Sequence, residues 1–229
     1  MSMRRAILLL VATAVAVGLS GCQSPAASDL FDVVILNGRV MDPETELDAV
    51  RNVGVRDGTI VTITEATIEG TDTIDAAGHV VAPGFIDTHH HGAGNPWGVK
   101  VGLRDGVTTP MDLELGTLNV DAWYADRNGR WPVNYGAAAS HEFHRMQVLD
   151  AMVMDGPKDG GDFGALRNAS YEENDVPDWA VTRASLDQLN AMIGNIDEDL
   201  RQGALGIAST TGYMANGITT LEPVSYTHL

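Results

Sequence analysis

Short apolar runs separated by turn residues fill the first part of the chain. Asn37-Gly38 and Asp57-Gly58 each follow such a run, and both dipeptides are strong signals for a tight β-hairpin turn, which needs positive φ values. The pattern predicts three hairpins, and hence a small β-sandwich or open sheet over residues 31–82. The predicted strands cover residues 31–36, 39–41, 52–56, 59–64, 71–76 and 79–82.

The pattern changes after residue 82, where apolar strands begin to alternate with helical segments. The predicted strands cover residues 80–86, 107–115, 133–140 and 205–209. Strands that alternate with helices predict βα units and a parallel sheet, so the expected fold class is α/β. We expect this second domain to extend over residues 83–223.

Helical spacing is clearest between Ser185 and Gln202, and the following glycine supplies a stop. The apolar positions recur every three to four residues and predict a face packed against the core. These positions are Leu186, Leu189, Met192, Ile193, Ile196 and Leu200. Shorter helices are expected over 99–103 and 121–128. Residues 155–178 are polar and without periodicity, which predicts a surface loop or a lid.

The first 21 residues have the pattern of a signal peptide. Two arginines precede an apolar run over residues 6–17, which is too short to span a membrane comfortably. Leu19-Ser20-Gly21-Cys22 resembles a bacterial lipobox, and Cys22 is the only cysteine. The pattern predicts a lipid anchor on Cys22 and a tether over residues 22–30. The expected location is the bacterial cell envelope, at the outer membrane facing the periplasm.

Charge and composition restrict the partners. The 229 residues carry a formal net charge of −17, and 44% of them are hydrophobic. The hydrophobic content supports a globular core. An acidic surface repels phosphate backbones, so we expect no nucleic-acid partner.

Metal-binding side chains gather at the ends of two predicted strands. His89 and His91 follow the strand over 80–86 and share a face, because side chains two apart on a strand point the same way. Neutral imidazole suits zinc and similar metals. Asp112 and Glu114 share a face of the next strand, where carboxylates are costly to bury unless paired or bound to metal. Glu114 is the candidate third ligand; Asp112 is the expected support, and its alternative role as the ligand stays open.

Several motifs carry a resemblance to a known family. Pro83-Gly84-Phe85-Ile86-Asp87-Thr88-His89-His90-His91 resembles the first metal-binding strand of the amidohydrolase superfamily. Gly106-Val107-Thr108-Thr109 and the acidic strand after it look like the D-aminoacylase and N-acyl-D-glutamate deacylase group. The strand that leads to His141, and the segment Gln202–Tyr213, are also similar to that group.

The resemblance implies a (β/α)8 TIM-type barrel preceded by a small β-domain, with about four of the eight strands in this chain. It implies zinc, as one or two divalent ions, held by His89, His91 and Glu114. It further implies a small N-acyl-D-amino acid as substrate, hydrolysed at its linear amide bond, with the preference for D over L left open. His141, Ser209 and Tyr213 are the candidate residues for contact with that substrate.

The resemblance also implies that the chain is an N-terminal fragment. Similar enzymes carry further metal-binding histidines and a catalytic aspartate on later strands, so the general base is unknown here and the fragment alone is expected to be inactive. Residues 224–229 resemble translated adapter sequence and are interpreted as an artefactual tail.

Two other functions stay open. One is a cyclic amide or imide hydrolase of the dihydropyrimidinase kind. Such enzymes use a carboxylated lysine on a later strand, and neither Lys100 nor Lys158 lies on a predicted barrel strand. The other is a non-catalytic, lipid-anchored binding protein, which would have no need to hold zinc.

Overall fold

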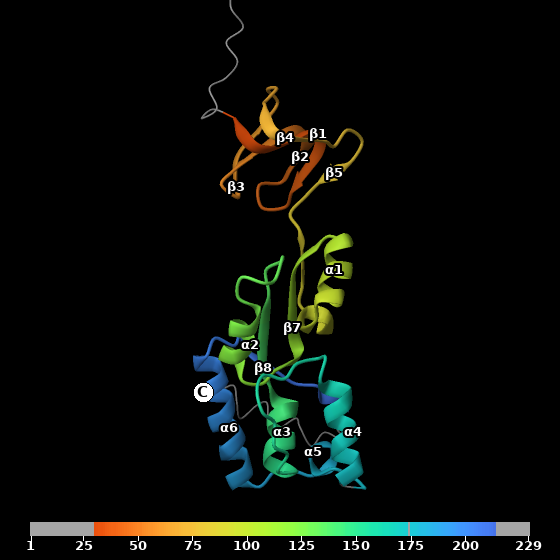
Figure 1. Ribbon diagram of the computed structural model, residues 1–229, viewed down its shortest axis with the longest axis vertical. Helices are drawn as coiled ribbons and strands as arrows, with labels where there is room; N and C mark the ends of the chain where they lie inside the picture. Colours follow the sequence, from red (N-terminus) through yellow and green to blue (C-terminus); the bar gives the residue numbers. More distant parts are fainter. Residues whose placement is uncertain (1–29, 174, 214–229) are drawn as a thin grey trace, which may run out of the picture. The chain divides into compact units, whose positions relative to one another are not determined.

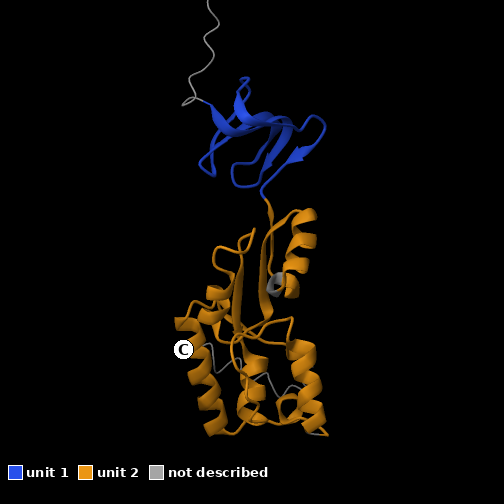
Figure 2. Ribbon diagram, in the orientation of Figure 1, with its two compact units in different colours: residues 1–83 blue, residues 84–229 orange. Residues whose placement is uncertain are grey.

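The structure is a computed structural model that describes residues 30–173 and 175–213. It divides into two compact units, residues 1–83 and 84–229, and each contains a β-sheet of its own (Figure 2).

Unit 1 contains one sheet of five strands (Figure 1). Its strands are β1 (Phe31–Asp42), β2 (Leu47–Arg56), β3 (Thr59–Thr64), β4 (Gly70–Asp75) and β5 (Val80–Val81). The order is β3-β2-β1-β4, and β5 also pairs with β1. The predicted hairpin at Asp57-Gly58 is confirmed, because Arg56 pairs with Thr59 across these two residues, and both have positive φ values of 51° and 71°.

The predicted hairpin at Asn37-Gly38 is wrong, because β1 continues through this dipeptide to Asp42. Asn37 has a φ of 62°, but the structure uses it in an irregularity of the β1–β2 pairing between Ile35 and Gly38. The Asn37 side chain donates a hydrogen bond to Asp75 at 3.0 Å. A signal for positive φ predicts the backbone angle, but a bulge satisfies it as well as a turn does.

The third predicted hairpin is also wrong. β4 and β5 do not pair with each other; each is parallel to β1. Val80 pairs with Arg39, while Ile74 pairs with Ile35, so the turn between them carries the chain along β1 instead of reversing it. The sequence pattern locates the strands and leaves their partners undetermined.

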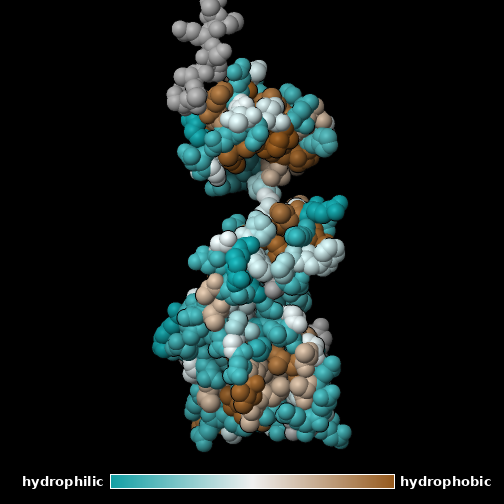
Figure 3. All heavy atoms as spheres, viewed as in Figure 1, coloured by the Kyte–Doolittle hydropathy of each residue, from teal (hydrophilic) through white to brown (hydrophobic). Residues whose placement is uncertain are grey.

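Hydrophobic side chains gather on the sheet of unit 1 (Figure 3). They surround a mainly apolar hollow of about 310 Å³ that lies over β1, β2 and β3 and extends to Pro83. Val34, Val40 and Val53 are buried in this unit.

Unit 2 contains a curved parallel sheet of four strands in the order β6-β7-β8-β9. Its strands are β6 (Phe85–Asp87), β7 (Val107–Thr117), β8 (Gly136–Ser140) and β9 (Ile207–Ala208). Its helices are α1 (Pro96–Arg104), α2 (Val120–Arg127), α3 (His141–Leu149), α4 (Phe163–Glu173), α5 (Asp178–Val181) and α6 (Leu186–Arg201), with 3₁₀ turns η1 (His91–Gly94) and η2 (Thr211–Tyr213). The predicted α/β fold, half of a TIM-type barrel after a small β-domain, is confirmed.

The predicted strand over residues 80–86 is divided between the units. Val80–Val81 pairs in unit 1 as β5, whereas Phe85–Asp87 pairs with β7 in unit 2 as β6. The apolar run predicts a buried strand, but Phe85 and Ile86 are exposed. β6 is an edge strand among the described residues, with β7 as its neighbour, so no second strand covers these side chains.

The interpretation of residues 155–178 as a stretch without regular structure is wrong, because α4 and the start of α5 lie there. Phe163 and Leu166 of α4 pack against the main core cluster of unit 2. That cluster contains Leu115, Leu118, Phe143, Met146, Met154, Trp179 and Ala180. The large apolar side chains of α4 that reach the core are too few to give a helical periodicity, and the packing supplies the missing stabilisation.

The predicted long helix is present as α6. Ser185 and Gln188 form a capping box, in which each side chain accepts a hydrogen bond from the other residue's backbone. Met192 and Ile196 are buried, but Leu186 is 72% exposed, so the predicted apolar face does not reach the first turn. α6 contacts α3, beside which Figure 1 shows it. No helix within residues 30–173 and 175–213 is long and apolar enough to cross a membrane.

Candidate metal centre

The two histidines follow β6 and lie beside the second half of β7. The backbone N–H of His90 donates to the carbonyl of Met111 at 3.0 Å, and Leu113 donates to the carbonyl of Thr88. These two bonds form an isolated β-bridge between His89 and Asp112, which holds the histidines beside Glu114. His90 turns the other way, with its ring against Gly92 and Gly102.

His89, His91 and Glu114 form a group of three potential metal ligands. The two Nε2 atoms are 3.2 Å apart, and Oε2 of Glu114 lies 3.9 Å from Nε2 of His89 and 3.4 Å from Nε2 of His91. A circle through three atoms at these distances has a radius of about 2 Å, which matches the zinc–nitrogen and zinc–oxygen distances of protein sites. The residues present therefore fit a divalent ion.

The exposure of the three side chains suits a site with open positions. The side chains are 63% exposed for His89, 44% for His91 and 27% for Glu114. A cation held by these residues would remain accessible to water and to a small molecule, as in catalytic rather than structural zinc sites.

Asp112 lies directly behind the cluster. Its Oδ2 is 3.0 Å from Nδ1 of His91, and its Oδ1 accepts hydrogen bonds from the backbone N–H groups of Leu115 and Gly116 at 3.0 Å each. Asp112 is buried, and it contacts the ring nitrogen of His91 that faces away from Glu114. This geometry suits the support role better than the ligand role.

A short segment, residues 157–161, lies against the backbone of His91; we call it the strap. Lys158 pairs with Leu118 just after β7, and its carbonyl accepts hydrogen bonds from the Leu118 N–H at 2.9 Å and from Thr117 Oγ1. Gly160 lies so close that a Cβ added there would be 2.9 Å from the carbonyl oxygen of His91.

Two predicted substrate residues lie together at the carboxyl ends of β8 and β9. His141 is buried, and its Nδ1 is 2.8 Å from Oγ of Ser209. Tyr213 closes η2, and its side chain lies outside the described residues, as do Cys22 and the predicted signal and tail. The role of His141, Ser209 and Tyr213 toward a substrate stays a prediction.

Sequence reasoning missed Glu142, which is fully buried at the start of α3. Its carboxylate pairs with Arg167 of α4 at 2.9 and 3.0 Å and accepts a hydrogen bond from Thr210. Burial raises the pKa of the Glu142 carboxyl, and the nearby charge of Glu114 acts in the same direction, while Arg167 and Thr210 oppose them. No motif marks this residue; its position beside His141 is the only signal available.

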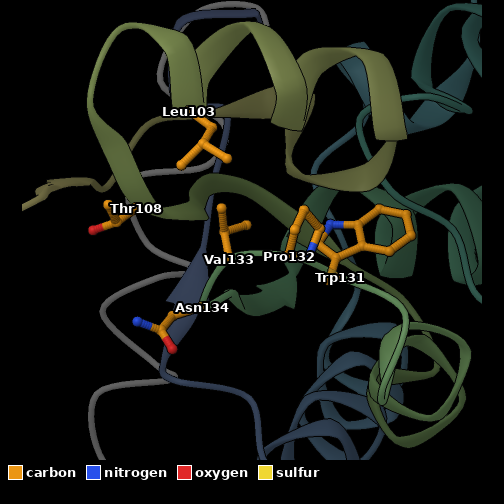
Figure 4. Close-up of a pocket in the computed structure, with 6 residues that line it drawn as sticks. All are labelled: Leu103, Thr108, Trp131, Pro132, Val133 and Asn134. Carbon is orange, nitrogen blue, oxygen red and sulfur yellow. The ribbon is translucent and has the colours of Figure 1, made fainter. Parts of the chain in front are cut away.

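One open pocket of unit 2 lies away from this cluster (Figure 4). It has a volume of about 370 Å³ and is lined by Leu103, Thr108, Trp131, Pro132, Val133 and Asn134. Thr108 is the second residue of β7 and Asn134 precedes β8, so the pocket lies at the amino ends of the strands. Active sites of parallel barrels lie at the opposite ends.

Unit 2 is a parallel half-barrel with a candidate metal-binding cluster beyond the end of its first strand, and two solved structures share this fold. The N-acyl-D-glutamate deacylase of Bordetella bronchiseptica, complexed with zinc and a phosphonate inhibitor, matches 86% of this chain with a TM-score of 0.63 and 22% identity. D-aminoacylase, described as defining a novel subset of amidohydrolases, matches the same share with a TM-score of 0.61 and 22% identity. The predicted resemblance to this group is confirmed.

Curated relatives extend the comparison. A dihydroorotase of Streptococcus pneumoniae is 57% identical over 60 residues, which are 26% of this chain and 14% of that protein. An allantoinase of Escherichia coli is 27% identical over 167 residues, which are 65% of this chain and 36% of that protein. The chain spans 42% of each deacylase chain. It therefore covers less than half the length of all four proteins. No protein-family model matches it.

Proposed function

We propose that this chain carries the first metal-binding strands of a metal-dependent amidohydrolase. The observation that carries the proposal is the cluster of His89, His91 and Glu114, whose three ligand atoms fit one divalent ion. The fold shared with two deacylases supports it, since D-aminoacylase is described as having a binuclear metal centre.

We propose zinc as the ion, because two imidazoles and one carboxylate are a common zinc-binding set. When bound, the ion polarises a carbonyl group and lowers the pKa of a water molecule. The chain's own contribution is to hold the ligands: β7 presents Glu114, and the β-bridge between His89 and Asp112 holds the histidines. A second ion is part of the proposal, because D-aminoacylase is described as having a binuclear metal centre.

The proposed substrate is an N-acyl-D-amino acid, cleaved at its linear amide bond. The support is the fold similarity to a deacylase and a D-aminoacylase over 86% of this chain. A cyclic amide hydrolase is the second candidate, because the curated relatives include a dihydroorotase and an allantoinase. Lys100 lies in α1 and Lys158 in the strap, so neither is on a strand.

Metal content tests the proposal directly. The full chain is purified, dialysed against Zn²⁺ and analysed by inductively coupled plasma mass spectrometry, together with His89→Ala, His91→Ala and Glu114→Ala. His79→Ala is the matched control, because His79 is an exposed histidine of unit 1. We expect at least one zinc per chain in the wild type and in the control, and a loss in the other three variants. A wild type without zinc would refute the proposal.

Substrate class is tested by binding to the zinc-loaded chain, because we expect this chain alone to be inactive. Isothermal titration calorimetry compares N-acetyl-D-glutamate, with N-acetyl-L-glutamate as the control, with dihydroorotate and allantoin. We expect the D-compound to bind most tightly. Tighter binding of the cyclic amides would favour the second candidate, and binding of zinc without binding of any of these compounds would favour the non-catalytic binding protein.

The anchor at Cys22 is a separate proposal that depends on the lipobox alone. It is tested by labelling cells that express the full chain with radioactive palmitate. We expect label in the wild type and none in Cys22→Ser. Equal labelling would contradict the anchor, and fractionation of the cells would test the outer-membrane location.

A further inference from the structure

Asp112 is a buried carboxylate whose two oxygens have different partners: one contacts the backbone of β7 and the other contacts His91. Oδ1 accepts the N–H groups of Leu115 and Gly116, both at 3.0 Å, which fixes the carboxylate on the backbone of β7. Oδ2 is left to face Nδ1 of His91, also at 3.0 Å. These two hydrogen bonds restrain the Asp112 side chain, so the position of Oδ2 is fixed relative to the backbone of β7.

The chemistry of these contacts determines which nitrogen of His91 carries its hydrogen. The carboxylate form of Asp112 can only accept hydrogen bonds, so a neutral His91 places its hydrogen on Nδ1. The lone pair is then on Nε2, the atom that lies 3.2 Å from Nε2 of His89 and 3.4 Å from Oε2 of Glu114. A metal ligand needs its lone pair on that atom.

We propose that Asp112 is a positioning residue that sets the tautomer and the ring orientation of His91 before a cation binds. This inference rests on the proposed metal site and explains how the site is prepared. It also separates the two acidic residues of β7: Glu114 faces the ion, and Asp112 faces the back of one ligand.

The strap lies against the backbone of His91. A Cβ built on Gly160 would lie 2.9 Å from the His91 carbonyl oxygen and 3.0 Å from its Cβ. Asp159 anchors the strap, because its Oδ2 accepts hydrogen bonds from Arg127 at 2.6 Å and from Trp123 Nε1 at 3.0 Å. The strap therefore limits how far the His91 backbone can move, while Asp112 contacts the ring.

Asparagine is the informative substitution at this position. The change Asp112→Asn would keep the shape of the side chain, and the one carbonyl oxygen of the amide would retain the two backbone N–H groups. The NH₂ group of the amide would then face His91 and favour a lone pair on Nδ1. The hydrogen would move to Nε2, which is the nitrogen that has to bind the metal.

The test compares the wild type with Asp112→Asn and with the control Asp105→Asn, an exposed aspartate next to α1. Zn²⁺ affinity is measured by competition with a chromophoric chelator. Nitrogen-15 NMR of the metal-free chain reports which imidazole nitrogen carries hydrogen, and loss of a signal in His91→Gln assigns it. We expect Nδ1–H in the wild type, Nε2–H in Asp112→Asn, and an affinity lower by roughly 10- to 100-fold, as for other supporting partners of metal-binding histidines.

The outcomes are separable. If the wild type binds no zinc, the proposed function fails, while the NMR experiment still tests the tautomer. If zinc binds but His91 of the metal-free wild type carries its hydrogen on Nε2, the positioning role is overturned and the metal site stands. The positioning role is also overturned if Asp112→Asn binds zinc as tightly as Asp105→Asn does.

Discussion

Gly160 lies where the strap crosses His91, and it has no side chain that could displace the histidine. We expect Gly160→Ala to lower the affinity for Zn²⁺ several-fold, because the new Cβ would be 2.9 Å from the His91 carbonyl oxygen and one of the two has to move. Isothermal titration calorimetry measures the change. Gly164→Ala is the matched control, because a Cβ there meets nothing within 4 Å. Equal affinities in the two variants would contradict a role for the strap.

Glu142 gives a prediction about pH. Because burial raises its pKa in the folded chain, the folded state binds more protons than the unfolded state between the two pKa values. The contribution of Glu142 to the free energy of unfolding is therefore largest at acid pH and falls as pH rises through the raised pKa. Urea denaturation from pH 4 to pH 8, with a chelator present, should show this slope in the wild type.

In Glu142→Gln that component of the slope should be absent, because the amide does not titrate. Glu172→Gln is the control, because Glu172 is an exposed residue of α4, the helix whose Arg167 pairs with Glu142. A wild type and a Glu142→Gln variant with the same pH dependence would contradict the prediction.

Single residues differ in how well the sequence predicts them. His89, His91 and Glu114 stand out because their chemistry is unusual at the end of an apolar strand, and the structure brings them together. Glu142 does not stand out. A charged residue at the start of a helix is ordinary, and only the burial beneath Arg167 and Thr210 makes it exceptional.

At the scale of elements, α6 is the helix that the sequence pattern predicts best, although the pattern does not predict which of its apolar residues are buried. Spacing and the stop signal predict the helix, while the exposed Leu186 shows that the core ends before the first turn. We expect Ile196→Ala to lower the free energy of unfolding by about 3 kcal/mol, because it empties a buried position. Leu186→Ala should change it by less than about 0.5 kcal/mol. Chemical denaturation measures both, and similar losses would contradict the burial.

The cap of α6 gives a second measurable effect. Ser185→Ala removes the oxygen that accepts the N–H of Gln188. We expect a loss of about 1 kcal/mol in the free energy of unfolding, the usual cost of such a cap. Ser185→Asp preserves the acceptor and should restore most of the stability. A Ser185→Ala variant as stable as the wild type would show that the capping box contributes nothing.

Other elements depend on partners that are distant in the sequence. α4 has no clear helical pattern, and it is stabilised by packing on residues from β7, α3 and α5. The Asn37-Gly38 dipeptide strongly predicts a hairpin turn, but in the structure it forms a bulge inside β1. β1 continues past it, and β4 and β5 both pair with β1. Local sequence patterns predict the backbone angles, and pairing between distant strands decides whether those angles form a turn or a bulge.

At the scale of the whole molecule, the metal cluster belongs entirely to unit 2. A ligand stabilises the part of a protein that binds it, by about 2.7 kcal/mol at a concentration 100 times its dissociation constant. We therefore expect Zn²⁺ to slow hydrogen exchange in β6, β7 and the strap, and to leave β1–β3 of unit 1 unchanged. Mass spectrometry of peptides from the full chain measures this, and His91→Ala is the control. Equal protection of both units would contradict it.

The sequence by itself determined the α/β class, the Asp57-Gly58 hairpin, most of α6 and the choice of His89, His91 and Glu114 as candidate metal ligands. These features follow from the spacing of neighbouring side chains, which the chain encodes locally. The tertiary structure decided the partners of β4 and β5, the existence of α4 and the burial of Glu142. It also distinguished Asp112 from Glu114. Strand alternation places both carboxylates on one face, but in the structure Asp112 faces Nδ1 of His91 and Glu114 faces Nε2.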